Sequence, residues 1–318
     1  MNALRTIALA TLLDIARQPI ILLLSLSCLA LTGLLPAAAV FAFGEEARLV
    51  RDGAMALHLL TGLLLAGAAA AAGIHSDIKR GGAATILCKP VSRSAYFLAT
   101  YAGVAGALLI FSASALCAGL LSARMVLPGL QLDGRPGALL AGALLAAPAY
   151  GAAANFWFRR PFVSHSWMAL LPCLAAALGL ACALEAPGRE ATAFGSLMAW
   201  NMAPAGVLVA QAILVLAALA VSFSTRLPPI LSTSACAVLF GLGLIADYVL
   251  RGLLGSDRLA GLAGRALPQW QNFWAVDALA GGGRIPWDYV ADAGLYAGLY
   301  VAAALAMGLA SFRHTEIV

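Results

Sequence analysis

Apolar residues in this chain fall in long runs, and most charged residues lie in the shorter segments between them. Each run holds about 20 residues, the length of helix that crosses the hydrocarbon core of a bilayer. The runs cover residues 20–43, 54–74, 96–122, 138–158, 166–184, 203–223, 229–250 and 288–311. The pattern predicts an all-α, polytopic transmembrane helix bundle with about eight spans, forming one domain over residues 1–318.

The composition excludes several classes of protein. Of the 318 residues, 63% are hydrophobic and only 10% are charged, whereas a soluble domain is roughly a quarter charged. No basic stripe interleaved with aromatic residues exists, so we expect no nucleic-acid partner. The six cysteines show neither a C-x-x-C pair nor a Cys/His cluster, so no metal site or disulfide framework is indicated.

Charge in the connecting segments predicts the orientation. With the N-terminus inside, the inner segments carry 10 Lys and Arg residues against three acids, and the outer segments carry 9 against 11. The inner cations are Arg5, Arg17, Lys79, Arg80, Lys89, Arg93, Arg159, Arg160, Arg226 and Arg313. Short loops dense in Lys and Arg remain in the cytoplasm. We therefore expect a multi-pass protein of the cytoplasmic (inner) membrane with both termini cytoplasmic.

Two segments outside the apolar runs also show helical patterns. Residues 1–19 are predicted to form an interfacial amphipathic helix, which Pro19 ends. Its apolar side would hold Leu4, Ile7, Ala8, Leu12 and Ile15; the alternative is that this stretch is the start of the first span. Residues 251–286 are the longest segment between runs. They are predicted to be extracytoplasmic, either with a short helix that carries Arg251, Arg258 and Arg265 or as a plain loop.

Few polar residues lie inside the runs. Asp247 is an intramembrane charge and hence a functional candidate, but Arg251 is four residues later, so a structural ion pair competes with a role in a conduction path. Gly62, Ala66 and Ala70 form a face of small residues that favours close helix packing. The four histidines lie on separate segments and are interpreted as loop or interface residues, and Met198 and Met202 as packing residues.

The segment 75–95 is the most informative part of the chain. Gly81 and Gly82 break the helix that leaves the second run, and Ser92 is placed to cap the next helix. Between them, Ile86 and Leu87 form an apolar pair on a short turn with cations at its rim. Such a segment fits a groove on a soluble partner. The chain has no G-x-x-x-x-G-K-[ST] loop, so it is not expected to hydrolyse ATP by itself.

This segment resembles the permease subunits of ABC-2-type transporters. The resemblance is closest to the branch that includes permeases for multicopper-enzyme maturation, nitrous oxide reductase assembly and gliding motility. The matching coupling-segment residues are Asp77, Ile78, Gly81, Ile86, Leu87, Lys89, Pro90, Val91, Ser92 and Arg93. The chain departs from the family pattern at Asp77, usually Glu, at Gly82, usually Thr, and at Ala99-Thr100, usually Gly-Lys.

Three weaker motifs occur in the family order. Residues 14–19 resemble the start of the first span, and 312–317 resemble the family's ending. Leu267, Pro268 and Phe273 match an outer-face motif that precedes the last span. The family core has six spans, so the resemblance implies that residues 138–184 are an inserted helical pair.

The resemblance implies a non-catalytic permease subunit, with a second permease chain and a separate ABC ATPase as partners. This chain would bind no cofactor, and ATP and Mg²⁺ would sit on the ATPase. ATP hydrolysis there would drive translocation, with export as the expected direction. The rival interpretation is a secondary transporter or channel without an ATPase, which would place charge and broken helices near the middle of the membrane.

Overall fold

Helices account for nearly all regular structure in the computed structural model, which describes residues 2–39, 44–75, 91–127, 131–184, 193–254 and 268–313. The long helices are α1 (Asn2–Ala16), α2 (Pro19–Ala39), α3 (Glu46–Ala70), α6 (Arg93–Met125), α7 (Gly134–Phe158), α8 (Phe162–Ala183), α9 (Ala203–Phe223), α10 (Pro229–Leu254) and α12 (Trp287–Arg313). A π-helical turn, η1 (Ala71–His75), continues α3. Short 3₁₀ turns lie at η2 (Trp200–Met202), η3 (Trp270–Phe273) and η4 (Val276–Gly282), and β1 (Val126–Leu127) pairs antiparallel with β2 (Gln131–Leu132).

Seven helices in the described part of the chain are long and apolar enough to cross a membrane, namely α2, α3 with η1, α6, α7, α8, α9 with η2, and α12. This confirms the predicted helical bundle of a multi-pass membrane protein. The predicted run 229–250 lies in α10, and the part of this helix whose side chains are described, Pro229–Ile245, is apolar. Whether α10 is an eighth span stays a prediction.

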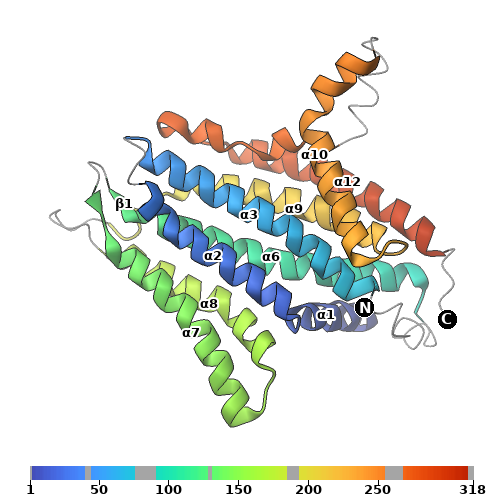
Figure 1. Cartoon of the computed structure of the whole chain (residues 1–318), viewed down its shortest axis with the longest axis horizontal. Coiled ribbons are helices and arrows are strands. Elements are labelled where there is room, and N and C mark those ends of the chain that lie inside the picture. The colour runs from blue at the N-terminus through green and yellow to red at the C-terminus, as the bar shows by residue number, and fades with distance from the viewer. Residues whose placement is uncertain are drawn as a thin grey trace.

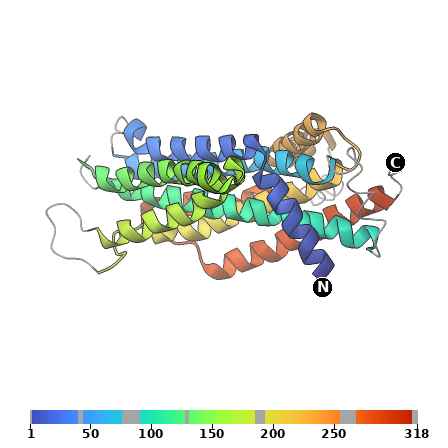
Figure 2. The same ribbon diagram turned by 90° about the horizontal axis from the view of Figure 1, so that it is seen from below.

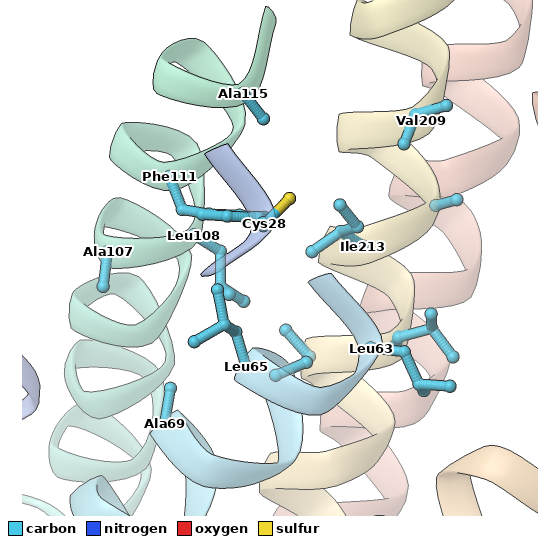
Figure 3. Packing of buried hydrophobic residues seen from close by; sticks show 14 of the residues in the cluster. Cys28, Leu63, Leu65, Ala69, Ala107, Leu108, Phe111, Ala115, Val209 and Ile213 are labelled. Carbon is cyan, nitrogen blue, oxygen red and sulfur yellow. The ribbon is translucent and has the colours of Figure 1, made fainter. Parts of the chain in front are cut away.

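The centre of the bundle is formed by α3, α6 and α9, with α2 and α12 on its flanks (Figure 1). Figure 3 shows Leu65 and Leu108 meeting between α3 and α6, and Ile213 of α9 on the other side of α3. A Cβ atom on Gly62 would collide with the Ile213 side chain. Gly62, Ala66 and Ala70 are all buried, as the small-residue pattern predicts. Lipid tails are as apolar as leucine, so the hydrophobic effect does not drive helices together within a membrane. Close van der Waals packing of this kind therefore stabilises the bundle.

Buried or partly buried polar groups form hydrogen bonds between the helices. Ser122 of α6 donates to the carbonyl oxygen of Thr32 in α2 at 2.7 Å. Trp167 of α8 donates through Nε1 to Ser25 Oγ in α2 at 3.1 Å, and Gln211 of α9 donates to the Val290 carbonyl oxygen in α12 at 3.1 Å. In an apolar environment a lost partner leaves a polar group unsatisfied, so these bonds also fix the helix register.

The bundle has two ends with different contents. The first, called the termini end here, holds α1, residues 91–93, residues 224–228 and the end of α12 (Figure 1). The second, called the β end, holds residues 44–46, the β1–β2 pair, residues 193–202 and the start of α12. The segments predicted to be cytoplasmic at 91–95 and 224–228 thus lie at one end together with α1.

Two parts lean away from the central helices. Helices α7 and α8 form an antiparallel pair whose turn lies apart from the rest of the bundle, and the last part of α10 stands clear of the other helices (Figure 1). The turn of the α7–α8 pair carries Phe156, Trp157 and Phe158, each more than two thirds exposed, followed by Arg159 and Arg160. Exposed aromatic rings beside arginines are typical of a membrane–water interface.

Candidate functional site

The segment predicted to couple this chain to an ATPase begins and ends at the termini end. Its residues Asp77, Ile78, Gly81, Ile86, Leu87, Lys89 and Pro90 lie outside the described residues. The structure describes the three that follow. Val91 packs partly buried against the core, and exposed Ser92 and Arg93 begin α6. Ser92 Oγ accepts a hydrogen bond from the Ala95 backbone N–H at 3.2 Å, which confirms the predicted N-cap.

The first turns of α6 are tied to the last turn of α12. The ring centroids of Tyr96 and Phe312 are 6.0 Å apart, and those of Phe97 and Phe312 are 5.8 Å apart. All three rings are fully buried. A displacement of the start of α6 would therefore be transmitted to the end of α12, because close-packed aromatic rings cannot move independently.

Helix α1 crosses the bundle obliquely at this end, against α6 and η1 (Figure 2). Its buried face carries Ile7, Thr11 and Ile15. Leu4, predicted on the apolar face, is 43% exposed. Leu4 lies on the same helical face as Thr11, seven residues earlier, but nearer the helix start. Thr11 can be buried because its hydroxyl donates to the Ile7 carbonyl oxygen at 3.0 Å.

A glycine allows α1 to approach α6 closely. A Cβ atom on Gly103 would collide with the Ala8 carbonyl oxygen and the Thr11 side chain. Gly73, in the π-helical turn η1, faces Thr11 and Thr100 at 3.2 Å each from its would-be Cβ. Single π turns inside helices often mark functional positions. The π-helical turn η1 thus precedes the segment 76–90, and helix α6 follows it. Both of these elements pack on α1.

The turn between α9 and α10 is fixed to α12 by an arginine. Arg226 donates through Nε to Ser311 Oγ at 3.0 Å and through Nη2 to the Ser311 carbonyl oxygen at 3.2 Å. Thr225 also donates to Ser311 Oγ, at 3.4 Å. Buried Ser232 donates to the Ala220 carbonyl oxygen at 3.1 Å, which closes the turn from the α10 side.

An open, mostly apolar groove lies beside this turn, between α9, α10 and α12. Its volume is about 420 Å³, within the range of pockets that hold small ligands. The lining residues are Leu219, Ser222, Phe223, Arg226, Leu227, Leu239, Pro268, Tyr300, Ala303, Ala304, Met307, Gly308 and Ser311. Helix α10 contacts α3 and α9 and leans away from α12, which leaves the groove open on that side (Figure 1).

The segment predicted to carry an outer-face motif packs between helices. Leu267 lies outside the described residues, but Pro268 is buried and lines the groove. Phe273 is 2% exposed and packs on Tyr296 of α12, with 5.9 Å between ring centroids. Backbone groups of the segment are held by tyrosines of α12: Tyr296 Oη accepts from the Gln269 N–H at 3.0 Å, and Tyr289 donates to the Asn272 carbonyl oxygen at 2.8 Å.

This segment therefore runs alongside the first half of α12 as two irregular residues, 268–269, followed by the 3₁₀ turn η3. Trp270, 3% exposed, lies against Phe240 of α10 with 5.4 Å between ring centroids. Gly243 provides the room, since a Cβ atom there would collide with the Trp270 ring. Irregular backbone at membrane depth is tolerated where protein covers it. The helix predicted for 251–265 falls on α10 up to Leu254 and afterwards on residues outside the described ones.

The β end holds a buried ion-pair network. Asp133 caps α7 by accepting from the Arg135 N–H at 3.1 Å, and it pairs with the side chains of Arg124 at 3.3 Å and Arg135 at 3.0 Å. The side chains of Arg124 and Asp133 are 1% and 2% exposed. Burial by itself would raise the pKa of Asp133, but the hydrogen bonds from Arg135 and the charges of both arginines outweigh it and hold the pKa below its ordinary value. This arrangement is structural, since it anchors the link between α6 and α7.

A histidine inside the membrane region is the functional candidate that the sequence interpretation missed. His58 of α3 is 1% exposed and meets the Phe111 ring edge-on, with 5.7 Å between ring centroids. Neither ring nitrogen has a hydrogen-bond partner among the residues that the structure describes. The interpretation of His58 as a loop or interface residue is therefore wrong. Its place within an apolar run was the signal that could have identified it.

Other predicted residues are less informative. Asp247 and Arg251 lie on α10, but their side chains are outside the described part of the chain, so their pairing stays a prediction. Met198 and Met202 are 7% and 0% exposed and belong to the core, as predicted. In the described ranges, no group of three or more His, Cys, Asp or Glu side chains could hold a metal ion.

Comparison of the chain with protein-family models, with curated proteins and with solved structures gives no match. The assignment of a function therefore rests on the motifs and on the geometry of the termini end.

Proposed function

We propose that this chain is the membrane-spanning permease subunit of an ATP-driven, ABC-2-type transporter. A separate ABC ATPase would hydrolyse ATP with Mg²⁺, and a second permease chain would complete the transporter. The chain itself would contribute no catalytic group and no cofactor site. Its substrate would cross between helices whose positions change when the ATPase closes.

The observation that carries this proposal is the position of the segment 76–90. It is bracketed by η1 and by the Ser92-capped start of α6, and both pack on α1. Force applied to this segment would reach α3 through η1, α1 through Gly73 and Gly103, and α12 through the Phe312 ring. Segments that transmit a switch act by moving packed elements between discrete arrangements.

The charge distribution supports a cytoplasmic position for the termini end. The described residues of that end include Arg5, Arg17, Arg93, Arg226 and Arg313, and a single acid, Asp14. The β end mixes arginines with acids such as Glu45, Glu46, Asp52, Asp133 and Asp277. Cations enriched on one side indicate the cytoplasmic side, which is where an ATPase has access to ATP.

A secondary transporter or channel is the second candidate. Two features favour it: the segment 268–273 between α10 and α12, which is not α-helical, and His58 in α3, whose ring nitrogens have no hydrogen-bond partner among the described residues. A proton- or ion-coupled carrier would use such elements near the middle of the membrane. It would need no ATPase, and its transport would depend on an ion gradient.

Purification of the tagged chain from its native membrane distinguishes the two candidates. The permease proposal expects a copurifying subunit with a P-loop, at one copy per permease chain by quantitative mass spectrometry, and ATP hydrolysis by the purified complex. A chain that purifies without such a subunit, and that transports in proteoliposomes when driven by an ion gradient alone, would establish the second candidate instead.

A further inference from the structure

The groove between α9, α10 and α12 has the shape of a site for one long, thin ligand. It extends along α12 from Tyr300 to Ser311, which corresponds to about 16 Å at the rise of an α-helix. Its volume of about 420 Å³ suits a small ligand. A helix from another protein, about 10 Å across, would need a far wider groove.

The walls of the groove offer few free polar atoms. Ser222, the serine in its α9 wall, donates to the carbonyl oxygens of Ala218 at 2.8 Å and Ala304 at 2.7 Å. The remaining wall between Tyr300 and Arg226 consists mainly of leucine, phenylalanine, alanine and methionine side chains. An occupant of this part should be apolar, because a polar one would lose its hydration without gaining partners.

One end of the groove is positively charged. Arg226 lines it there and is exposed, held in place by its two hydrogen bonds to Ser311. None of the ion pairs formed by the described residues involves Arg226. A guanidinium group fixed beside a hydrophobic groove is complementary to a phosphate joined to an apolar tail. Arg226 is also at the termini end of the bundle, where a bilayer crossed by these helices would place the headgroups of one leaflet.

We propose that this groove is a binding site for an anionic phospholipid. One acyl chain lies along α12 between Leu219, Leu239 and Met307, and the phosphate group contacts Arg226. The lipid fills the space that α10 leaves by leaning away from α12. A negatively charged headgroup is favoured over a zwitterionic one because none of the described residues that line the groove is a carboxylate that would offset the arginine charge.

The headgroup is tested by native mass spectrometry. The chain is reconstituted in nanodiscs with equal amounts of phosphatidylglycerol and phosphatidylcholine, extracted in mild detergent, and the retained lipids are counted. Phosphatidylglycerol should be retained preferentially, and Arg226→Gln should reduce that preference about tenfold, as expected for loss of a charge-assisted contact. Arg160→Gln, which removes an exposed arginine at the α7–α8 turn, is the matched control and should leave the preference unchanged. Ser311→Ala should also preserve it, since the charge of Arg226 remains.

The acyl chain is tested with phosphatidylglycerol that carries a photoreactive group on one tail. Cross-links should fall on peptides containing 219–227 and 300–311. Ala303→Phe, which fills the groove, should abolish them, and Ala302→Phe, on the neighbouring exposed face of α12, should not. Millimolar inorganic phosphate should not compete, because it lacks the tail.

Three results would overturn the proposal: equal retention of the two lipids by the unaltered chain, an unchanged preference in Arg226→Gln, or equal cross-linking in the two phenylalanine variants. The test requires neither ATP nor a partner chain. Its outcome is therefore independent of the proposed permease function.

Discussion

Arg226 and Ser311 are 85 positions apart in the chain, and two hydrogen bonds, of 3.0 and 3.2 Å, hold them together at the termini end. The first is accepted by the serine hydroxyl and the second by its carbonyl oxygen. The pair fixes the turn between α9 and α10 to the last turns of α12. It also positions the guanidinium group at one end of the groove between α9, α10 and α12.

Replacing Arg226 by lysine should loosen this turn. Lysine keeps the charge but cannot donate from two nitrogen atoms in one plane, so one hydrogen bond to Ser311 is lost. Amide hydrogen exchange at residues 224–228 should become several-fold faster, while exchange in the α7–α8 pair stays the same. Arg17→Lys, at an exposed position of the same end, is the control. Equal exchange rates in Arg226→Lys and the unaltered chain would show that the pair does not stabilise the turn.

Helix α7 should place its two ends on opposite sides of the membrane. In a background without other reactive cysteines, Arg135→Cys should react with an impermeant thiol reagent added outside intact cells, and Arg160→Cys should react only after permeabilisation. Cys88 should likewise be shielded from outside. Labelling of positions 135 and 160 from the same side, or of Cys88 in intact cells, would contradict the proposed orientation.

Gly103→Ala should weaken the docking of α1 on α6. The added methyl group meets the Ala8 carbonyl oxygen, which belongs to the backbone and cannot rotate away. Overpacking of this kind costs about 1–3 kcal/mol, and α1 should become more accessible to protease. Gly142→Ala is the matched control, because a Cβ atom there has no neighbour within 4 Å. If both variants unfold at the temperature of the unaltered chain, α1 is not tightly packed on α6.

Asp133→Asn should destabilise the chain more than Arg135→Gln does. Asparagine can still cap α7, but the buried Arg124 loses its compensating charge, a change that costs about 3–5 kcal/mol in buried pairs. The Arg135 side chain is 46% exposed, so solvent screens its pair with Asp133, and losing this pair should destabilise the chain less.

The same network gives a pH dependence with a definite sign. The folded-state pKa of Asp133 lies below its ordinary value of 3.8. The ionised Asp133 carboxylate therefore makes its full contribution to the free energy of unfolding when the pH is above that ordinary value. This contribution is lost as the pH falls through the depressed pKa. The difference in melting temperature between the unaltered chain and Asp133→Asn should stay constant from neutral pH to about pH 5. A difference that shrinks between pH 8 and pH 6 would assign the effect to another group.

The sequence predicted the elements whose signals are local. Pro19 separates α1 from α2, Ser92 caps α6, and the face of small residues that includes Gly62 is buried. These features could be predicted because each depends on residues within a few helical turns. The buried face of α1 was harder to predict, since Thr11 is polar and is buried there only because its hydroxyl donates to a carbonyl oxygen of its own helix.

The sequence could not predict features that depend on distant residues. The chain from Pro268 to Phe273 is polar enough to suggest an exposed loop, but tyrosines 17 and 27 residues later bind its backbone and keep it beside α12. The groove exists because α10 leans away from α12. It could not be predicted from the sequence because hydropathy indicates the length of a helix but not its tilt. Arg226 was recognised as an inner-loop cation, whereas its contact with Ser311 required the fold.

The central claim is that the segment 75–95 couples this chain to an ATPase, and one variant tests it directly. Leu87→Asp places a charge in the apolar groove that we expect on the partner. This change should weaken binding of the ATPase more than Lys89→Ala does, since Lys89→Ala only removes a charge at the rim. Leu132→Asp, at the opposite end of the bundle, introduces the same charge at a half-exposed leucine and controls for insertion and folding. The measurement is ATP turnover of the ATPase reconstituted with each permease variant. We expect Leu87→Asp to insert normally but neither retain the ATPase nor stimulate its turnover, while Lys89→Ala and Leu132→Asp do both. Unchanged stimulated hydrolysis with Leu87→Asp would contradict the claim that this segment is the coupling element.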